Sequence, residues 1–318
     1  MKVAQIIAGY TLGGADIRDY FSYVSFNFAS LAENPFLRGL DNGKKLYNYT
    51  DGFGQMILEK GYQAEGHDDS HPDVGGHIGV RQGGADDFNI LIDEGKKLNM
   101  KIGIHVNVGE YILDSYFVPD IEIFRRDANG YPNSKGWGWI DQAFYFDDTA
   151  DLLSGELDRR FEILKKDAPD LGWVYVDIYS GSDWDARMVS DTLNKYGWMN
   201  ATEFSGPMEQ NVVWTHWGTD LYYPTSGDGS KVFRYIYNDT KDAYPTTSPY
   251  VSKLLRGSVQ PGIGTWQNRT SITEGVQVFY VQNLPSKYMQ YFPVARWDEN
   301  EIIFGAPKTY NENGGVEM

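Results

Sequence analysis

The stretch ADDFNILIDEGKKLNMKIGIHV, residues 85–106, decides the fold class. Its first part carries apolar residues near helical spacing, which predicts a helix over Ala85–Leu98. After a short turn, the apolar run Lys101–Val106 predicts a strand. A helix that leads within a few residues into a buried strand is the repeating unit of a parallel α/β fold.

Similar strand-like runs recur on both sides of this stretch, separated by segments of helical period such as Asp151–Lys166. No GxGxxG sequence follows any of them. A (β/α)8 barrel of the TIM type is therefore favoured over an open doubly wound sheet. The predicted strands are Val3–Ala8, Tyr23–Phe28, Lys101–Val106, Trp173–Tyr179, Met199–Phe204, Val212–His216 and Gly275–Tyr280.

Three segments rich in Gly, Pro, Asn or Asp are predicted as long loops at the carboxyl ends of the strands, where barrels build their sites. They are Gly66–Gly84, Asn129–Gly138 and Thr219–Ser230. From Trp297 onward the α/β rhythm is lost. We therefore expect a barrel domain over residues 1–296 and a short β-rich tail, the start of a β-rich region, over residues 297–318.

Charge and composition exclude several classes of function. The 28 basic and 44 acidic residues give a net charge of −16, so nucleic acid or an anionic membrane surface would be repelled. The chain has no Cys, which excludes thiol nucleophiles and Cys-ligated zinc. No stretch approaches the roughly 18–20 apolar residues of a membrane span. The first residues reach Asp16 and Arg18 too early for a signal peptide, which leaves a mature or excised piece of a secreted protein as an option.

Aromatic side chains are unusually frequent, with 9 Trp, 23 Tyr and 16 Phe. Trp137 and Trp139 lie in a polar, Gly-flanked loop, where they serve either a small satellite core or a ligand. Pyranose C–H faces stack on such rings, so these residues indicate a carbohydrate site. Further tryptophans near predicted strand ends are Trp184, Trp214, Trp217 and Trp266.

Two carboxylates end consecutive predicted strands, Asp177 in GWVYVDIYSG and Glu203 in GWMNATEFSG. Neighbouring strands lie about 4.8 Å apart. The two groups can therefore approach the roughly 5–5.5 Å separation that is typical of retaining glycoside hydrolases. Two structural alternatives stay open: Asp177 as a cap of the following helix, and Glu203 as a surface residue at a strand end.

A dense group of His and Asp residues in GHDDSHPDVGGHIG suggests a metal site. Against that interpretation, Pro72 and Gly75–Gly76 keep its histidines off one helix face, and no HExxH accompanies them. Direct hydrogen bonding to sugar hydroxyls is the simpler use. The alternative is a metal-dependent barrel hydrolase that uses His67, Asp68 and His71, with further ligands from His105 and His216.

Seven strings of this sequence resemble the catalytic barrel of the endo-α-N-acetylgalactosaminidases, glycoside hydrolase family 101. They are GHDDSHPDVGGHIGVRQGGADDF, KIGIHVN, GWGWIDQ, WVYVDIY, TEFSGPMEQ, VWTHWGTD and QNLPSKYMQYF. The similarity runs from near residue 3 to about residue 297. It implies retaining hydrolysis of the α-linkage between GalNAc and Ser or Thr, which releases the core 1 disaccharide Galβ1-3GalNAc from mucin-type O-glycoproteins.

The resemblance also implies a role for individual residues. Asp177 matches the nucleophile and Glu203 the general acid/base. The residues implied to bind the glycan are His67, Asp68, Trp137, Trp139 and Gln282, the last at the end of a late strand and with Gln277 as its alternative. No metal and no required cofactor are implied, although a structural calcium ion stays open.

Members of this family are typically large, multidomain, secreted or surface-bound proteins with β-rich domains on both sides of the barrel. We therefore expect a secreted or cell-surface location and an O-glycoprotein or mucin glycan as the partner. The chain is expected to be an excised catalytic domain, a natural minimal form or a redesigned one. A glycan-binding module without catalysis is a third hypothesis, which the presence of Asp177 and Glu203 disfavours.

Overall fold

A computed structural model describes most of the first two thirds of the chain and part of its end. The described residues are 19–27, 32–64, 66, 71–112, 115–116, 124–133, 143–179, 181–204, 207–208, 211–217, 271–289, 292, 294–297, 302–305, 309–310 and 316–317. The predicted strand Val3–Ala8 and the predicted loop Thr219–Ser230 lie outside these residues.

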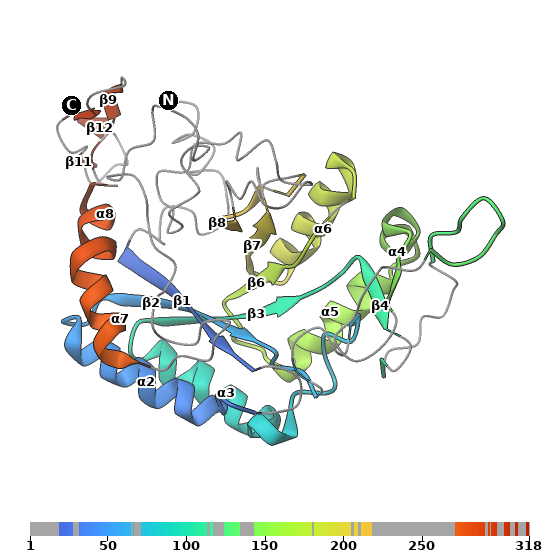
Figure 1. Ribbon diagram of the computed structural model, residues 1–318, viewed down its shortest axis with the longest axis horizontal. Coiled ribbons are helices and arrows are strands. Elements are labelled where there is room, and N and C mark those ends of the chain that lie inside the picture. The colour runs from blue at the N-terminus through green and yellow to red at the C-terminus, as the bar shows by residue number, and fades with distance from the viewer. Residues whose placement is uncertain are drawn as a thin grey trace.

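The centre of the described part is a curved, six-stranded parallel sheet (Figure 1). Its strands lie side by side in chain order, and every neighbouring pair is parallel. They are β1 (Tyr20–Phe26), β2 (Gly54–Lys60), β3 (Met100–Val106), β6 (Trp173–Val176), β7 (Met199–Phe204) and β8 (Trp214–Trp217). The predicted parallel α/β architecture is confirmed, whereas closure into an eight-stranded barrel stays a prediction.

Five of these strands lie where the sequence predicts them, and β2 is the strand that the sequence does not predict. The run GQMILEK is polar at both ends, yet all seven of its residues are buried. Partners compensate the polar groups: the Gln55 amide donates to the Gly43 carbonyl, and the Tyr23 hydroxyl donates to the Gln55 side chain. Buried polar residues with hydrogen-bond partners interrupt the apolar run that is expected of a central parallel strand. The hydrophobic pattern therefore does not predict β2.

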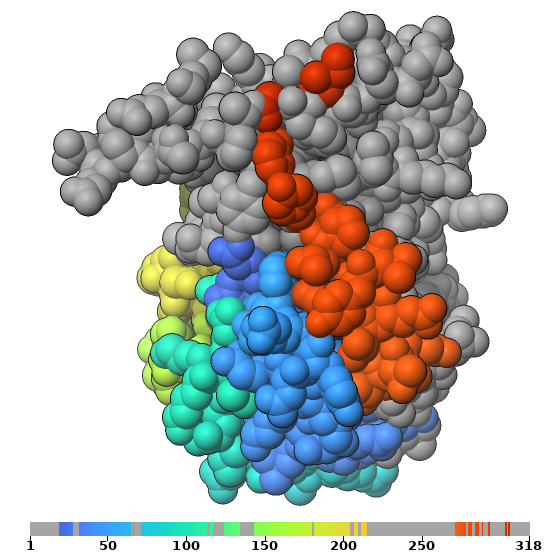
Figure 2. Space-filling view, turned by 90° about the vertical axis from the view of Figure 1, so that its left-hand side faces the viewer, coloured from blue at the N-terminus to red at the C-terminus, as the bar shows by residue number. Residues whose placement is uncertain are grey.

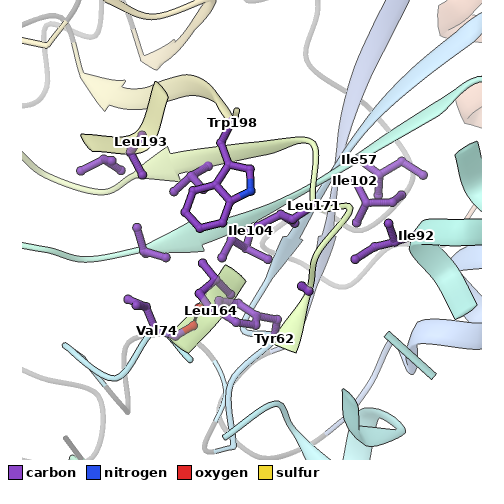
Figure 3. Packing of buried hydrophobic residues seen from close by; sticks show 14 of the residues in the cluster. Ile57, Tyr62, Val74, Ile92, Ile102, Ile104, Leu164, Leu171, Leu193 and Trp198 are labelled. Carbon is purple, nitrogen blue, oxygen red and sulfur yellow. Dashed lines mark hydrogen bonds between the residues drawn. The ribbon is translucent and has the colours of Figure 1, made fainter. Parts of the chain in front are cut away.

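Four helices cover the outer face of the sheet, and the main core lies between the two layers (Figure 3). Ile57 of β2 lies there near Ile102 and Ile92, and Ile104 of β3 lies near Leu164 and the buried indole of Trp198. The helices are α2 (Phe36–Tyr49), α3 (Gly84–Lys96), α5 (Glu156–Asp167) and α6 (Asp183–Lys195). The predicted helix Ala85–Leu98 is thus confirmed as α3.

The predicted helix Asp151–Lys166 is in fact two helices, α4 (Asp148–Ser154) and α5. Gly155 between them adopts φ = +84°, a left-handed conformation that ends α4. The Asp147 side chain accepts from the Ala150 N–H and caps the start of α4. A buried ion pair between Arg160 and Asp151 joins the two helices.

The inner face of the sheet holds a second core that is rich in large rings. Trp173 and Trp214 pack there with ring centroids 5.3 Å apart, and both are almost fully buried. Gly103 makes room for them, since a Cβ at that position would lie 2.2 Å from the Trp173 indole. The expectation that Trp214 stacks on sugar is therefore wrong, because a curved sheet needs bulky residues to fill its concave side.

The predicted strand Gly275–Tyr280 is wrong, because this segment is helical. It comprises α7 (Ile272–Val278), the π-helical turn η7 (Phe279–Asn283) and α8 (Leu284–Met289). Ser271 caps it by accepting from the Glu274 N–H. The alternation GVQVFY suggests a strand, but Ile272, Val276 and Phe279 follow helical spacing and all pack against the main core. The Phe279 ring centroid lies 5.2 Å from that of Phe21. Figure 2 shows α7 lying against α2.

The remaining elements are short. They are η3 (Val80–Gln82), the antiparallel pair β4 (Glu110–Ile112) and β5 (Ala143–Tyr145), the antiparallel pair β9 (Val294–Trp297) and β10 (Ile302–Phe304), and the antiparallel pair β11 (Thr309–Tyr310) and β12 (Val316–Glu317). The domain boundary near residue 297 stays a prediction. Within the described ranges, no helix is both long and apolar enough to cross a membrane.

Candidate active site

Four polar side chains stand on the inner face of the sheet at the carboxyl ends of four adjacent strands. They are Lys60 after β2's apolar run, His105 in β3, Asp177 directly after β6, and Glu203 in β7. In each strand, the residue two positions earlier faces the inner core or lines it, so the alternation of the strand carries the polar group to the same face. All four side chains belong to residues that are between 1% and 6% exposed.

The position of Asp177 is fixed by a backbone hydrogen bond of its own and by the conformation of the residue that follows it. Its N–H donates to the Val106 carbonyl at 2.8 Å, which extends the β3–β6 pairing by one residue. The next residue, Ile178, has φ = +29°, a conformation that is strained for a β-branched residue. Asp177 does not cap α6, because Ser182 does so in a capping box with Asp185. The helix-cap alternative for Asp177 is therefore wrong.

The Asp177 carboxylate faces a histidine from the neighbouring strand. The His105 Nε2 lies 3.0 Å from the Asp177 Oδ1, and the His105 ring stacks on Tyr175 with centroids 5.2 Å apart. Burial alone would raise the Asp177 pKa, but His105, a hydrogen bond from Glu203 and the charge of Lys60 outweigh it. The pKa of Asp177 therefore lies well below its usual value, and the group is a carboxylate at neutral pH.

Glu203 is the hydrogen-bond partner of Asp177 across the β6–β7 pair. The Thr202 hydroxyl donates to the Val176 carbonyl at 3.1 Å and fixes the two strands beside this contact. The hydrogen bond from Glu203 is one of the interactions that lower the Asp177 pKa. Since Glu203 is only 6% exposed, it is not a surface residue. The site thus brings two buried carboxyl groups together at the ends of adjacent strands.

The other predicted site residues are described less fully. His67, Asp68, Trp137, Trp139 and Trp266 lie outside the described residues. Gln282 belongs to the helical turn η7 rather than to a strand end, and Gln277 is exposed on α7. Trp184 is 49% exposed at the start of α6, the helix that follows Asp177 in the chain.

The histidines near the predicted metal cluster have carboxylate partners. The His71 Nε2 lies 3.5 Å from the Glu110 Oε2, and the His77 Nδ1 lies 2.6 Å from the Asp73 Oδ2. Among the described residues, no group of three or more His, Cys, Asp or Glu is arranged to hold a metal ion. The part of the chain that is described therefore gives the metal-dependent alternative no support.

Lys60 is the member of the site that sequence reasoning missed. Its signal is the alternation of MILEK, where Met56 and Leu58 face the inner core and the next residue in that series is Lys60. A lysine that follows apolar residues on the inner side of a strand is easily read as the exposed end of that strand. Only the neighbouring strands show that it is buried.

Comparison with solved structures supports the assignment of the fold. An α-N-acetylgalactosaminidase, NagBb from Bifidobacterium bifidum, superposes in its GalNAc complex with a TM-score of 0.62 at 13% identity, over 92% of this chain and 57% of that one. Its ligand-free structure gives a TM-score of 0.64 at 13% identity, over 99% and 63%. At this identity the likeness shows a shared fold.

The family follows from the sequence comparisons. Residues 6–275 match the glycoside hydrolase 101 family, described as endo-α-N-acetylgalactosaminidase. A curated protein of Renibacterium salmoninarum, provisionally named as such an enzyme, is 35% identical over 295 residues, which cover 91% of this chain and 19% of that protein. This chain belongs to glycoside hydrolase family 101. It spans about a fifth of the length of that curated relative.

Proposed function

We propose that this chain is the catalytic part of a retaining endo-α-N-acetylgalactosaminidase. The bond it cleaves is the α-linkage between Galβ1-3GalNAc and Ser or Thr of mucin-type O-glycoproteins. The observation that carries the proposal is the placement of two buried carboxyl groups, Asp177 and Glu203, side by side at the carboxyl ends of strands β6 and β7. Family membership supports the choice of substrate, and the fold shared with NagBb is compatible with it.

The reaction uses both groups of this pair in turn. An Asp177 oxygen attacks the anomeric carbon while Glu203 gives its proton to the leaving Ser or Thr oxygen, which forms a glycosyl ester on Asp177. Glu203, now a carboxylate, takes a proton from a water molecule, and the resulting hydroxide attacks the same carbon. The sugar leaves with its configuration retained, Asp177 is again a carboxylate, and Glu203 again carries a proton.

The separation of the two carboxyl groups supports retention. Inverting enzymes keep them roughly 6.5–9.5 Å apart so that a water molecule fits between the base and the sugar. Asp177 and Glu203 each lie one residue beyond the Val176–Thr202 pair of the adjacent strands β6 and β7, and neighbouring strands are about 4.8 Å apart. This spacing agrees with the separation of about 5–5.5 Å that a nucleophilic mechanism uses.

The glycan-binding part of the proposal concerns His67, Asp68, Trp137, Trp139 and Gln282. It rests on the resemblance of their sequence strings to the family. The same proposal includes closure of the described sheet into a (β/α)8 barrel within residues 1–296 and an extracellular location. The net charge of −16 suits a neutral glycan better than a polyanionic one.

The test is hydrolysis of p-nitrophenyl α-glycosides by the purified chain. We expect release of the intact disaccharide from the Galβ1-3GalNAc glycoside, little release from the GalNAc glycoside, and no loss of rate with a chelator. Proton NMR of the first product formed should show the α-anomer. Appearance of the β-anomer would contradict retention, and loss of activity with the chelator would favour the metal-dependent alternative.

We expect Asp177→Asn to lower kcat by about a thousandfold or more, because the amide cannot form the glycosyl ester. Binding of the disaccharide, measured by calorimetry, should persist. Glu59→Gln serves as the control, since Glu59 is also a buried carboxyl group but lies on the outer side of β2. Near-normal turnover in Asp177→Asn would refute the assignment, and a wild-type chain that binds glycan without cleaving it would instead be a glycan-binding module.

A further inference from the structure

Lys60 is a buried cation that has no role in the reaction proposed for Asp177 and Glu203. It is 1% exposed and ranks among the largest fully buried side chains of the described residues. Its Nζ lies 6.0 Å from the centroid of the Tyr175 ring, the same ring that stacks on His105. Because an ammonium group loses strong hydration when it is buried, a fold retains one in the interior only where negative charge compensates it.

The negative charge that faces Lys60 comes from the site. Asp177 feels the charge of Lys60, which contributes to its low pKa. Glu59, the neighbour of Lys60 in the chain, faces the outer layer, and burial raises its pKa to about 8, so it is neutral at pH 7. The other titratable groups near Asp177 are His105 from β3 and Glu203 from β7. His216 belongs to β8, the strand that pairs with β7 on its far side from Asp177.

The negative charge of the pair moves during the proposed reaction. In the reaction as proposed, it lies on Asp177 in the free enzyme, where Glu203 carries the proton. In the glycosyl-enzyme Asp177 is a neutral ester, and the charge lies on Glu203, which has given its proton to the leaving group.

We propose that Lys60 is a positioning residue whose positive charge compensates the negative charge that alternates between Asp177 and Glu203. This inference rests on the proposed function. With Lys60 in place, Asp177 stays ionised as a nucleophile and is a good leaving group when water attacks the ester. The residue acts through the two carboxyl groups and needs no contact with the sugar.

The test compares Lys60→Met with Lys60→Arg in the purified chain. Removal of the charge should raise the Asp177 pKa, so the acid limb of kcat/KM should move up by about one pH unit. Arginine keeps the charge and should leave that limb close to its wild-type position, even if its size lowers the rate. Lys101→Met is the matched control, since Lys101 lies on β3 at the opposite end of the sheet, 4.8 Å from the Tyr20 ring, and should not move the limb.

A second readout does not depend on turnover. In chains labelled with ¹³C at the Asp carboxyl carbons, Asp177→Asn identifies the Asp177 resonance, and its titration midpoint should rise in Lys60→Met. A lower rate with an unchanged acid limb and an unchanged midpoint would reduce Lys60 to a packing role and overturn the inference.

The two proposals can fail separately. If the wild type is inactive on the glycosides, the proposed function fails, and the carboxyl titration still decides the electrostatic role of Lys60. If Lys60→Met does not fold, Lys60→Gln takes its place in both measurements.

Discussion

Asp177 and Glu203 are similar carboxyl groups that their surroundings make different. Asp177 receives the contact with His105, the hydrogen bond from Glu203 and the charge of Lys60, all of which lower its pKa. The assignment of nucleophile and acid therefore depends on neighbours from three other strands.

We expect Glu203→Gln to separate the two steps of the proposed reaction. An activated leaving group such as dinitrophenolate needs no proton, so formation of the glycosyl ester on Asp177 should continue while its hydrolysis slows by about a hundredfold or more. A pre-steady-state burst of dinitrophenolate followed by slow turnover is the expected trace. Azide, which attacks without a general base, should restore turnover.

Thr202→Ser is the control for this variant, because Thr202 precedes Glu203 in β7 and its hydroxyl bonds to the Val176 carbonyl. Serine keeps that hydroxyl, so near wild-type kinetics are expected. If Glu203→Gln shows neither a burst nor rescue by azide, Glu203 is not the acid/base of a retaining mechanism.

The packing of α2 on β2 contains a buried acid at its centre. Glu59 is 0% exposed, and a side chain at Gly39 would lie 3.1 Å from its Oε1. Burial raises the Glu59 pKa from 4.5 to about 8. Because the folded-state pKa is the higher one, the stability from this neutral acid is fully present below about pH 4.5 and is lost as the pH rises toward 8.

Glu59→Gln should therefore become more favourable relative to the wild type as the pH rises. Glutamine resembles the neutral acid in shape and carries no proton to lose. We expect the difference in melting temperature, variant minus wild type, to grow by a few degrees between about pH 5 and about pH 8. Glu162→Gln, which changes an exposed glutamate on α5, should give a flat difference. A flat difference for Glu59→Gln would show that Glu59 ionises normally in the fold.

The whole chain carries an excess of 16 negative charges, which repel one another more strongly in the folded form than in the unfolded one. Screening by salt should therefore stabilise the fold. We expect the free energy of unfolding to rise by about 1 kcal/mol between about 10 mM and about 150 mM KCl. Urea denaturation at each salt concentration measures it, with sucrose at matched osmolality as the control. No rise with KCl would mean that local ion pairs already balance the charge.

Much of the fold and the central pair of the site could be predicted from local sequence. Strand Met199–Phe204 agrees with β7 residue for residue, because β-branched and apolar residues bounded by turns report on local backbone preference. The positions of Asp177 and Glu203 could be predicted for the same reason. Each residue lies at the end of an apolar strand, and the carboxyl ends of parallel strands meet at one edge of the sheet. The sequence strings that resemble glycoside hydrolase family 101 indicate the family without reference to the fold.

The tertiary structure alone decided what depends on contacts between distant residues. Strand β2 and the burial of Lys60 need partners from β1, β3 and β6, and the helix at Ile272–Val278 needs the apolar surface that receives Phe279. The inward packing of Trp214 depends on the space that Gly103 leaves for its partner Trp173. Sequence pattern fixes which backbone conformation a segment prefers and which groups share a face, but burial and electrostatic environment are sums over neighbours that the chain brings together only when it folds.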